Sequence, residues 1–357
     1  MNVTRATVDL DDVDGLLAAD RDGVLRGASM AGAQVRATAA ALAEGELDAL
    51  RADQPPRTLI WLADRGNGRT AGSLLAAAVG ASVGTPIVVA AEVPPWIGAL
   101  DVLVVAGDDP GDPVLVSAAA TALHRGARVV VVAPAEGPLR DVAAGRAVML
   151  APRVWVPDEF SLTRYLAAGL AILNVVSPGM QVNLDALADE LDAEAFRNSA
   201  AHELFTNPAK TLAHRMSDRE VVLAGDNPAT LTLARHGASI TLRVAHRVVA
   251  AVGLADALAA LRAGFGGPPG DDRLFHDEQI DGPLPERVRT FVLTTDAERQ
   301  VVLARVGGLD DVDVLNAEDV PDGEAAPTID DGRPERQLAM LAVRLEMTAA
   351  YLKLVRG

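Results

Sequence analysis

The chain has 357 residues, of which 50% are hydrophobic and 3% aromatic, and its formal net charge is −17. This length accommodates two ordinary domains, whose cores must be built from small aliphatic side chains. The acidic charge repels nucleic acids and anionic membrane surfaces, so we expect neither as a partner. Cysteine is absent, which excludes disulfides, thiol nucleophiles and thiolate zinc sites.

The amino terminus has no basic segment followed by an apolar one, which a secretory signal would require. No stretch reaches the roughly 18 uncharged apolar residues of a membrane span. We therefore expect a cytoplasmic protein.

The first half of the chain alternates between helical and strand patterns. Helical spacing at 8–20 and an alanine-rich segment at 28–51 predict helices that cover the sheet that follows. The elements expected next are strands at 58–63, 86–91, 101–106, 127–133 and 147–150, and helices at 70–80, 113–125, 138–144 and 160–173. This alternation predicts parallel βαβ units.

The pattern breaks around Ser177 to Asn183, and a helical segment with Leu184, Leu187 and Leu191 begins there. The second half predicts helices at 208–216, 228–236, 254–261 and 297–306, strands at 220–224, 239–244, 289–294 and 312–315, and an apolar final helix. That last helix has a packing face for the body or for a second subunit. We predict an α/β protein with helices at 1–56 and two domains, 57–178 and 179–357, each a parallel sheet flanked by helices in three layers.

The stretch 57–78 predicts a strand, a glycine turn and a helix. Gly66 and Gly68 allow backbone conformations that a Cβ would forbid, and Gly72 allows the helix to pack closely on the sheet. Free N–H groups of the first helical turn and the helix dipole favour an anion. The predicted anion site comprises Gly66, Asn67, Gly68, Arg69 and Thr70.

A nucleotide is an alternative ligand for this glycine turn. Gly66, Gly68 and Ala71 fit the pattern G-x-G-x-x-A, and Glu92 ends the next strand near the place of a ribose-binding acid. That reading predicts an NAD(P)-dependent enzyme. A Walker A loop is excluded, because Arg69 stands in place of its lysine and the first glycine is missing.

Two further loops follow strands of the same predicted sheet. The loop 106–113 contains Gly107 and Asp108, and Asp112 is placed to cap the next helix. The loop 133–138 contains Glu136 and Gly137. The carboxyl ends of parallel strands meet at one edge, where open α/β sheets bind ligands. The three loops together therefore predict a small-molecule site.

The histidines give no metal-ligand pattern, so we expect no metal. His276 follows a glycine-rich loop and remains a candidate acid or base. Lys210, one of only two lysines, lies in the first turn of the helix that Pro208 begins. It is either a solvated side chain or a phosphate contact.

The order of these pieces resembles the SIS (sugar isomerase) domain family, and in particular the bifunctional phosphoglucose/phosphomannose isomerases. The resemblance lies in the stretches LADRGNGRTAGSLL at 62–75, AEVPPWIGALDVLVVAG at 91–107, LHRGARVVVVAPAEGPL at 123–139, NPAKTLAHRM at 207–216 and YLKLVRG at 351–357. It implies two tandem SIS domains with five-stranded parallel sheets, a homodimer, and no cofactor. It also implies isomerisation of glucose and mannose 6-phosphates between aldose and ketose through an enediolate.

The sequence departs from the family's catalytic pattern. The phosphate loop Ser-x-Ser-Gly-Asn-Thr is replaced by 106–113, which has three carboxylates and no hydroxyl, and Glu136 adds another charge. The segment that supplies the base falls near 242–247, where His246 is the only titratable base. The lysine of the final helix is replaced near Tyr351. We carry over no catalytic residue, and His246 and His276 remain the candidates.

Two hypotheses follow from these observations. The chain is an active phosphosugar isomerase with a relocated base, or it is a catalytically inactive ligand-binding or regulatory relative. In both, the expected ligand is a small phosphorylated sugar. The residues expected to bind it are Gly66, Asn67, Gly68, Arg69, Thr70, Gly107, Asp108, Glu136, Gly137 and Lys210.

Overall fold

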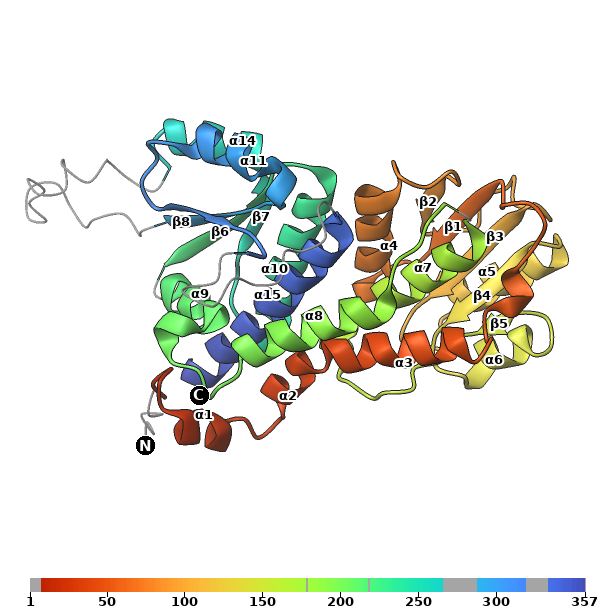
Figure 1. Ribbon diagram of the computed structural model, residues 1–357, viewed down its shortest axis with the longest axis horizontal. Coiled ribbons are helices and arrows are strands. Elements are labelled where there is room, and N and C mark those ends of the chain that lie inside the picture. The colour runs from red at the N-terminus through yellow and green to blue at the C-terminus, as the bar shows by residue number, and fades with distance from the viewer. Residues whose placement is uncertain (1–7, 178, 218, 266–287, 319–332, 357) are drawn as a thin grey trace, which may run out of the picture. The chain divides into compact units, whose positions relative to one another are not determined.

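The computed structural model describes residues 8–177, 179–217, 219–265, 288–318 and 333–356 (Figure 1). The chain divides into two compact units, one within Ser29–Ala195 and the other within Met1–Ala28 and Phe196–Gly357. This division differs from the expected bounds at two places: residues 1–28 cluster with the second half of the chain, and residues up to 195 cluster with the first. Within the described ranges, no helix has the length and apolar character that crossing a membrane requires.

The first unit is a parallel sheet between two layers of helices, as predicted. Its strands are β1 (Thr58–Leu62), β2 (Ile87–Ala90), β3 (Asp101–Ala106), β4 (Arg128–Val132) and β5 (Val148–Met149), in the order β2-β1-β3-β4-β5. Its helices are α3 (Ala31–Ala43), α4 (Gly66–Val79), α5 (Pro113–His124), α6 (Gly137–Ala143), α7 (Leu162–Val176) and α8 (Leu184–Arg197). The helices α5 and α6 share one apolar core with the sheet, while α7 packs on α4 and α3. The strands are apolar because both faces of the sheet are covered.

One glycine allows α4 to pack closely on the sheet, and another allows α7 to pack closely on α4. A Cβ on Gly72 would lie 2.2 Å from Cδ1 of Trp61, and one on Gly169 would lie 2.1 Å from Cδ1 of Leu75. Trp61 is fully buried in β1, and its indole N–H donates to the carbonyl of Gly68 at 2.8 Å. The expectation that Gly72 allows close packing is confirmed.

The segment before β1 is broken where one long helix was expected over 28–51. It contains α2 (Val24–Ser29), α3 and a 3-10 turn, Asp48–Leu50. Gly45, with φ of 83°, follows α3. Along α3, Arg36 pairs with Asp189 at 2.6 Å and with Asp192, both on α8. These pairs are consistent with α8 clustering with the first unit.

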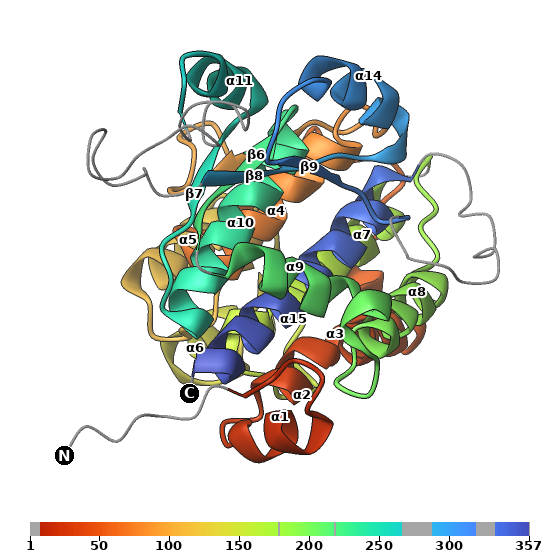
Figure 2. The same ribbon diagram turned by 90° about the vertical axis from the view of Figure 1, so that its left-hand side faces the viewer.

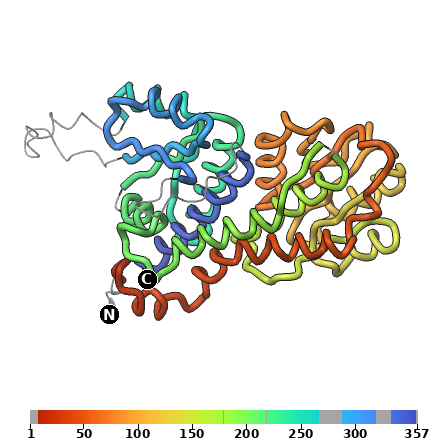
Figure 3. The backbone as a smooth tube through the Cα atoms, in the orientation of Figure 1, coloured from red at the N-terminus to blue at the C-terminus, as the bar shows by residue number. Residues whose placement is uncertain are grey.

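The second unit also has a parallel sheet, with four strands among its described residues. They are β6 (Glu220–Gly225), β7 (Ala250–Gly253), β8 (Val288–Leu293) and β9 (Val312–Leu315), in the order β7-β6-β8-β9. Figure 2 shows α11 (Leu254–Arg262) and α14 (Asp296–Val306) on one face, and α10 (Pro228–Ala245) and α15 (Pro334–Arg356) on the other. The helix α9 (Pro208–Met216) packs on α15. The helix α1 (Val13–Ala19), red in Figure 3, also contacts the blue α15. Asp22, which follows α1, pairs with Lys353 of α15 at 2.6 Å.

The predicted strand at 239–244 is wrong, because these residues continue α10. Asn227 and Thr230 form a capping box that starts this helix. Ile240, Thr241 and Val244, spaced as on one helical face, are buried. The preference of β-branched residues for strands is overridden by burial in the α10–α15 layer. The strand of this region is instead β7, which was not predicted.

A buried ionisable pair joins α10 to α15. Nε2 of His236 lies 3.0 Å from a carboxylate oxygen of Glu346, and the two side chains are 2% and 1% exposed. Burial raises the pKa of Glu346, while the hydrogen bond and the charge of His236 act in the opposite direction. A carboxyl group with a raised pKa contributes stability that is present at low pH and lost as the pH rises through its folded-state value.

Glu346→Gln should therefore gain stability relative to the wild type as the pH rises. The glutamine keeps a hydrogen-bonding partner for His236 but cannot ionise. As the pH rises above the ordinary pKa of a glutamate, the difference in unfolding free energy should move in favour of the variant, measured by urea denaturation at a series of pH values. Glu220→Gln, at an exposed position, is the control. Parallel pH profiles for the wild type and Glu346→Gln would contradict this account.

Candidate functional site

The three loops expected to form a site follow neighbouring strands of the first sheet. β1 pairs with β3, and β3 pairs with β4. A Cβ on Gly68 would lie 3.1 Å from the carbonyl oxygen of Ala106, so the first loop touches the end of β3. The N–H of Leu139 donates to the carbonyl of Pro110 at 3.1 Å, which joins the second loop to the third. The sheet order therefore brings the three loops together at its carboxyl edge.

The helix α4 begins at Gly66, four residues earlier than predicted. Gly66 has φ of 65°, a conformation that favours glycine. Arg65 precedes the helix with an extended backbone and makes no side-chain cap. In the described part of the chain, the N–H groups of Gly66, Asn67 and Gly68 have no acceptor, and the first helical bond runs from Arg69 to Arg65 at 3.4 Å. The helix start therefore presents three open N–H groups.

The side chain of Asn67 fixes this helix start to the segment before α7. Its amide nitrogen donates to the carbonyls of Asp158 at 2.8 Å and Glu159 at 3.0 Å, and it lies 3.2 Å from Oγ of Ser161. Asn67 is 5% exposed. Its side chain therefore positions the loop, while its backbone N–H remains open.

Arg69 and Thr70 lie beside these N–H groups. Arg69 is exposed, and its guanidinium donates to the carbonyl of Ala63, at the end of β1, at 3.3 Å. Among the described residues it has no carboxylate partner. Thr70 donates its hydroxyl to the carbonyl of Gly66 at 3.2 Å. The guanidinium of Arg69 is thus an uncompensated positive charge at the carboxyl end of β1.

The carboxylate of Asp108, in the second loop beside Gly107, is compensated. Arg164 pairs with its Oδ1 at 2.5 Å, and the hydroxyl of Tyr165 donates to the same oxygen at 2.7 Å. The guanidinium of Arg164 also lies over the ring of Tyr165, 4.5 Å from its centroid. Burial raises the pKa of Tyr165, so this hydroxyl stays protonated and donates. Asp108 is held by α7.

The start of α5 is closed by its own cap. Oδ1 of Asp112 accepts from the N–H of Val114 at 2.8 Å, as expected for a capping residue. Its other oxygen accepts from Arg65 at 3.0 Å. In the third loop, Glu136 is exposed and Gly137 begins the short α6 with φ of 61°. Of the longer helices α4 and α5 that start at this edge, α4 is the uncapped one.

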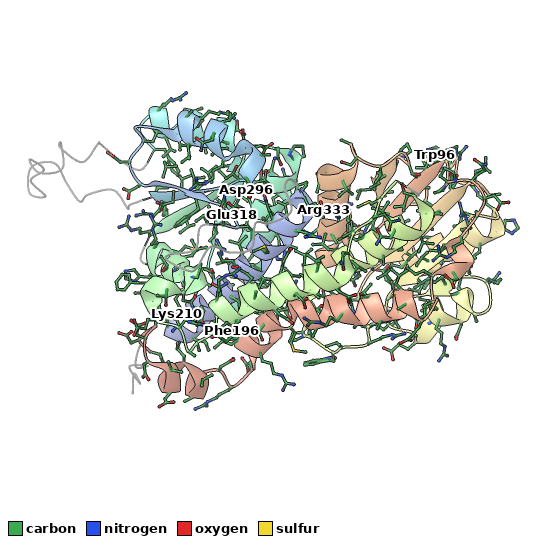
Figure 4. All side chains as sticks on the ribbon, viewed as in Figure 1. Trp96, Phe196, Lys210, Asp296, Glu318 and Arg333 are labelled. Atoms are coloured by element: carbon green, nitrogen blue, oxygen red, sulfur yellow. The ribbon has the colours of Figure 1, made fainter. Side chains whose placement is uncertain are left out.

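Lys210 belongs to the second unit, on α9 beside α15 (Figure 4). It is fully buried, and Nζ donates to the carbonyls of Ala200 at 2.9 Å and His202 at 2.7 Å. The ammonium also lies 5.7 Å from the ring centroid of Tyr351. Burial lowers the pKa of Lys210. Lys210 therefore holds a loop of its own chain in place, and we do not include it in the proposed phosphate site.

His246 ends α10 in the left-handed conformation, with φ of 54°. It is exposed, and its backbone N–H donates to the carbonyl of Thr241. Its position is therefore that of a helix cap. His276 lies outside the described residues. Where the chain is described, no group of three or more histidine, aspartate and glutamate side chains is placed to hold a metal.

The cations that compensate two of the three carboxylates of the loop 106–113, Asp108 and Asp112, were not predicted from the sequence. Arg164 stands 56 residues from Asp108, and Arg65 stands 47 residues from Asp112. No spacing rule links such pairs. The available signal was the charge itself, since three carboxylates at one sheet edge require nearby cations.

No protein-family model and no curated protein match this sequence. Solved structures match it over nearly the whole chain. A glucose-6-phosphate isomerase-like protein from Thermus thermophilus has a TM-score of 0.54 and 19% identity, over 98% of this chain and 96% of that one. Tagatose-6-phosphate ketose/aldose isomerase from Escherichia coli has a TM-score of 0.59 and 15% identity, over 93% and 90%.

The C-terminal domain of glucosamine-fructose-6-phosphate aminotransferase from Francisella tularensis has a TM-score of 0.58 and 11% identity, over 96% of both chains. At these identities the matches establish a shared fold. They confirm the predicted architecture of two tandem α/β domains of the SIS type.

His246→Gly should stabilise the protein. A left-handed backbone costs a residue with a Cβ roughly 1–2 kcal/mol, and glycine avoids that cost at a helix end. The unfolding free energy should therefore rise by about 1 kcal/mol in urea denaturation at unchanged m-value. His246→Ala keeps the Cβ and should not gain. A loss of stability in the glycine variant would show that the imidazole makes contacts that hold the fold.

Proposed function

We propose that this chain, which has the tandem SIS fold of phosphosugar isomerases, binds a phosphorylated sugar at the carboxyl edge of its first sheet. The phosphate accepts hydrogen bonds from the N–H groups of Gly66, Asn67 and Gly68 and pairs with Arg69. Two of the matching solved structures carry glucose 6-phosphate and tagatose 6-phosphate in their names, and this supports the ligand class.

The observation that carries the proposal is the contrast between two helix starts at the same edge. Asp112 caps α5 and closes its N–H groups. No side chain caps α4, and the exposed Arg69 stands beside its open N–H groups. Backbone N–H groups at a helix start, with a nearby guanidinium, are suited to a phosphate.

The carboxylates of the acidic loops repel a phosphate less than their number in the sequence suggests. Asp108 is paired with Arg164, and Asp112 is paired with Arg65. A carboxylate that is paired with a cation repels an approaching anion less than a free one does, because their fields partly cancel. Gly107 and Gly137 in these loops then line the approach to the sugar, with Glu136 at its exposed margin.

We further propose binding without isomerisation. An aldose–ketose isomerase needs a base within hydrogen-bond reach of the sugar's C2 proton. The segment 242–247, where the family's base falls, contains no glutamate, and the final-helix lysine is replaced near Tyr351. His246 acts as a helix cap. From the resemblance we also propose a cytoplasmic homodimer that needs no cofactor, and light scattering of the purified chain decides its oligomeric state.

Arg69→Ala should weaken the binding of glucose 6-phosphate or fructose 6-phosphate by about tenfold or more in titration calorimetry. A charge-assisted hydrogen bond contributes roughly 1.5–3 kcal/mol, which corresponds to that loss. Arg146→Ala is a matched control, since Arg146 is an exposed arginine that also donates to a backbone carbonyl, that of Val142. Unchanged affinity in Arg69→Ala would reject Arg69 as the phosphate contact.

Proton NMR in D2O separates binding from catalysis. Glucose, mannose and fructose 6-phosphates should show line broadening with the wild type, and neither interconversion nor deuterium at C2. Unphosphorylated glucose is the control for the phosphate contact. Deuterium incorporation would show an active isomerase, while tight binding of NAD(P) without any effect on sugar phosphates would favour the nucleotide alternative.

A further inference from the structure

A small polar pocket lies in the first unit, between α3, α7 and the segment that follows β5. Its lining includes Gln34 and Thr38 of α3, Arg164 of α7, Val132 at the end of β4, and Arg153. The volume open to the centre of a water molecule is about 20 Å³, which holds one water-sized group. None of the residues 66–70 lines it. The pocket is therefore distinct from the proposed phosphate site.

Two residues of the lining each carry a buried polar atom without a hydrogen-bond partner. These atoms are Oε1 of Gln34 and Nε of Arg164. Gln34 is 3% exposed, and its amide nitrogen donates to the carbonyl of Phe160 at 3.0 Å. That bond fixes the orientation of the amide, because the flipped form would oppose two oxygens. The protein itself supplies no partner for this acceptor and this donor, so a bound water or hydroxyl group would satisfy both.

The charges of the pocket are already balanced. Arg164 pairs with Asp108, and Arg153 pairs with Glu44 and Glu46. A phosphate or carboxylate group gains no free cation there, and it has no proton to donate to the oxygen of Gln34. An ammonium group donates but cannot accept from Arg164. A hydroxyl group does both, as does the water that it would replace.

We propose that this pocket binds a small neutral polyol, which inserts one hydroxyl group. The hydroxyl accepts from Nε of Arg164 and donates to Oε1 of Gln34. The inference goes beyond the proposed sugar-phosphate site and does not rest on it, because none of the residues 66–70 lines the pocket. Loss of phosphate binding in Arg69→Ala therefore says nothing about this pocket. Arg164 belongs to the pocket and also pairs with Asp108 of the second loop.

The test is saturation-transfer NMR with erythritol on the full chain. The wild type should give a signal that titrates with erythritol. Ala37→Leu fills the pocket, because Ala37 lines it, and should reduce the signal by about fivefold or more. Ala40→Leu is the matched control on the same helix, since Ala40 is also half-buried but does not line the pocket.

A second variant tests the hydrogen bonds rather than the space. Arg164→Lys keeps a positive charge for Asp108 and removes the Nε donor, so erythritol should bind about two- to tenfold more weakly. No signal from the wild type would mean that the pocket holds water only, and would overturn the proposal. Equal signals from the wild type and Ala37→Leu would overturn it as well, because the polyol would then sit elsewhere.

Discussion

The indole of Trp61 is the contact on which the first unit's ligand edge depends. It fills the space under Gly72 and donates its N–H to the carbonyl of Gly68. The hydrogen bond fixes the first turn of α4 against β1, and the glycine allows the rest of the helix to lie directly on the sheet. A buried aromatic side chain therefore fixes the orientation of the open N–H groups in this turn. A Cβ at position 72 would displace the helix and the site together.

The parallel sheets were predictable because their signals are local. Each strand of the first sheet is an apolar run between glycine, proline or acidic turns, and its bounds agree with the prediction to within a few residues. The segment 239–244 was not predictable in this way. Its β-branched residues favour a strand, but they are buried on α10, which packs against α15 about a hundred residues later. The helical structure of this segment is determined by its burial against α15, and a local sequence pattern carries no information about that contact.

The features of the candidate site likewise divide into those that neighbouring residues determine and those that depend on distant segments. The glycine turn at Gly66 and the cap at Asp112 follow from neighbouring residues, and the sequence contains both. The compensation of Asp108 by Arg164 and the burial of Lys210 against Tyr351 join distant segments. The loop carboxylates, which from the sequence alone predict repulsion of a phosphate, are therefore partly compensated by cations in the folded chain. Whether Lys210 is free to bind a ligand or is bound within its own chain could likewise be decided only from the fold.

Trp61 also gives the protein a built-in optical reporter. The chain has three tryptophans; Trp61 is fully buried, while Trp96 and Trp155 are 46% and 85% exposed. The emission of Trp61 is therefore blue-shifted from that of the other two. Because its N–H is bonded inside the first turn of α4, its fluorescence responds to any displacement of that turn. With Trp96 and Trp155 replaced by phenylalanine, the chain reports the state of its own ligand edge without a label.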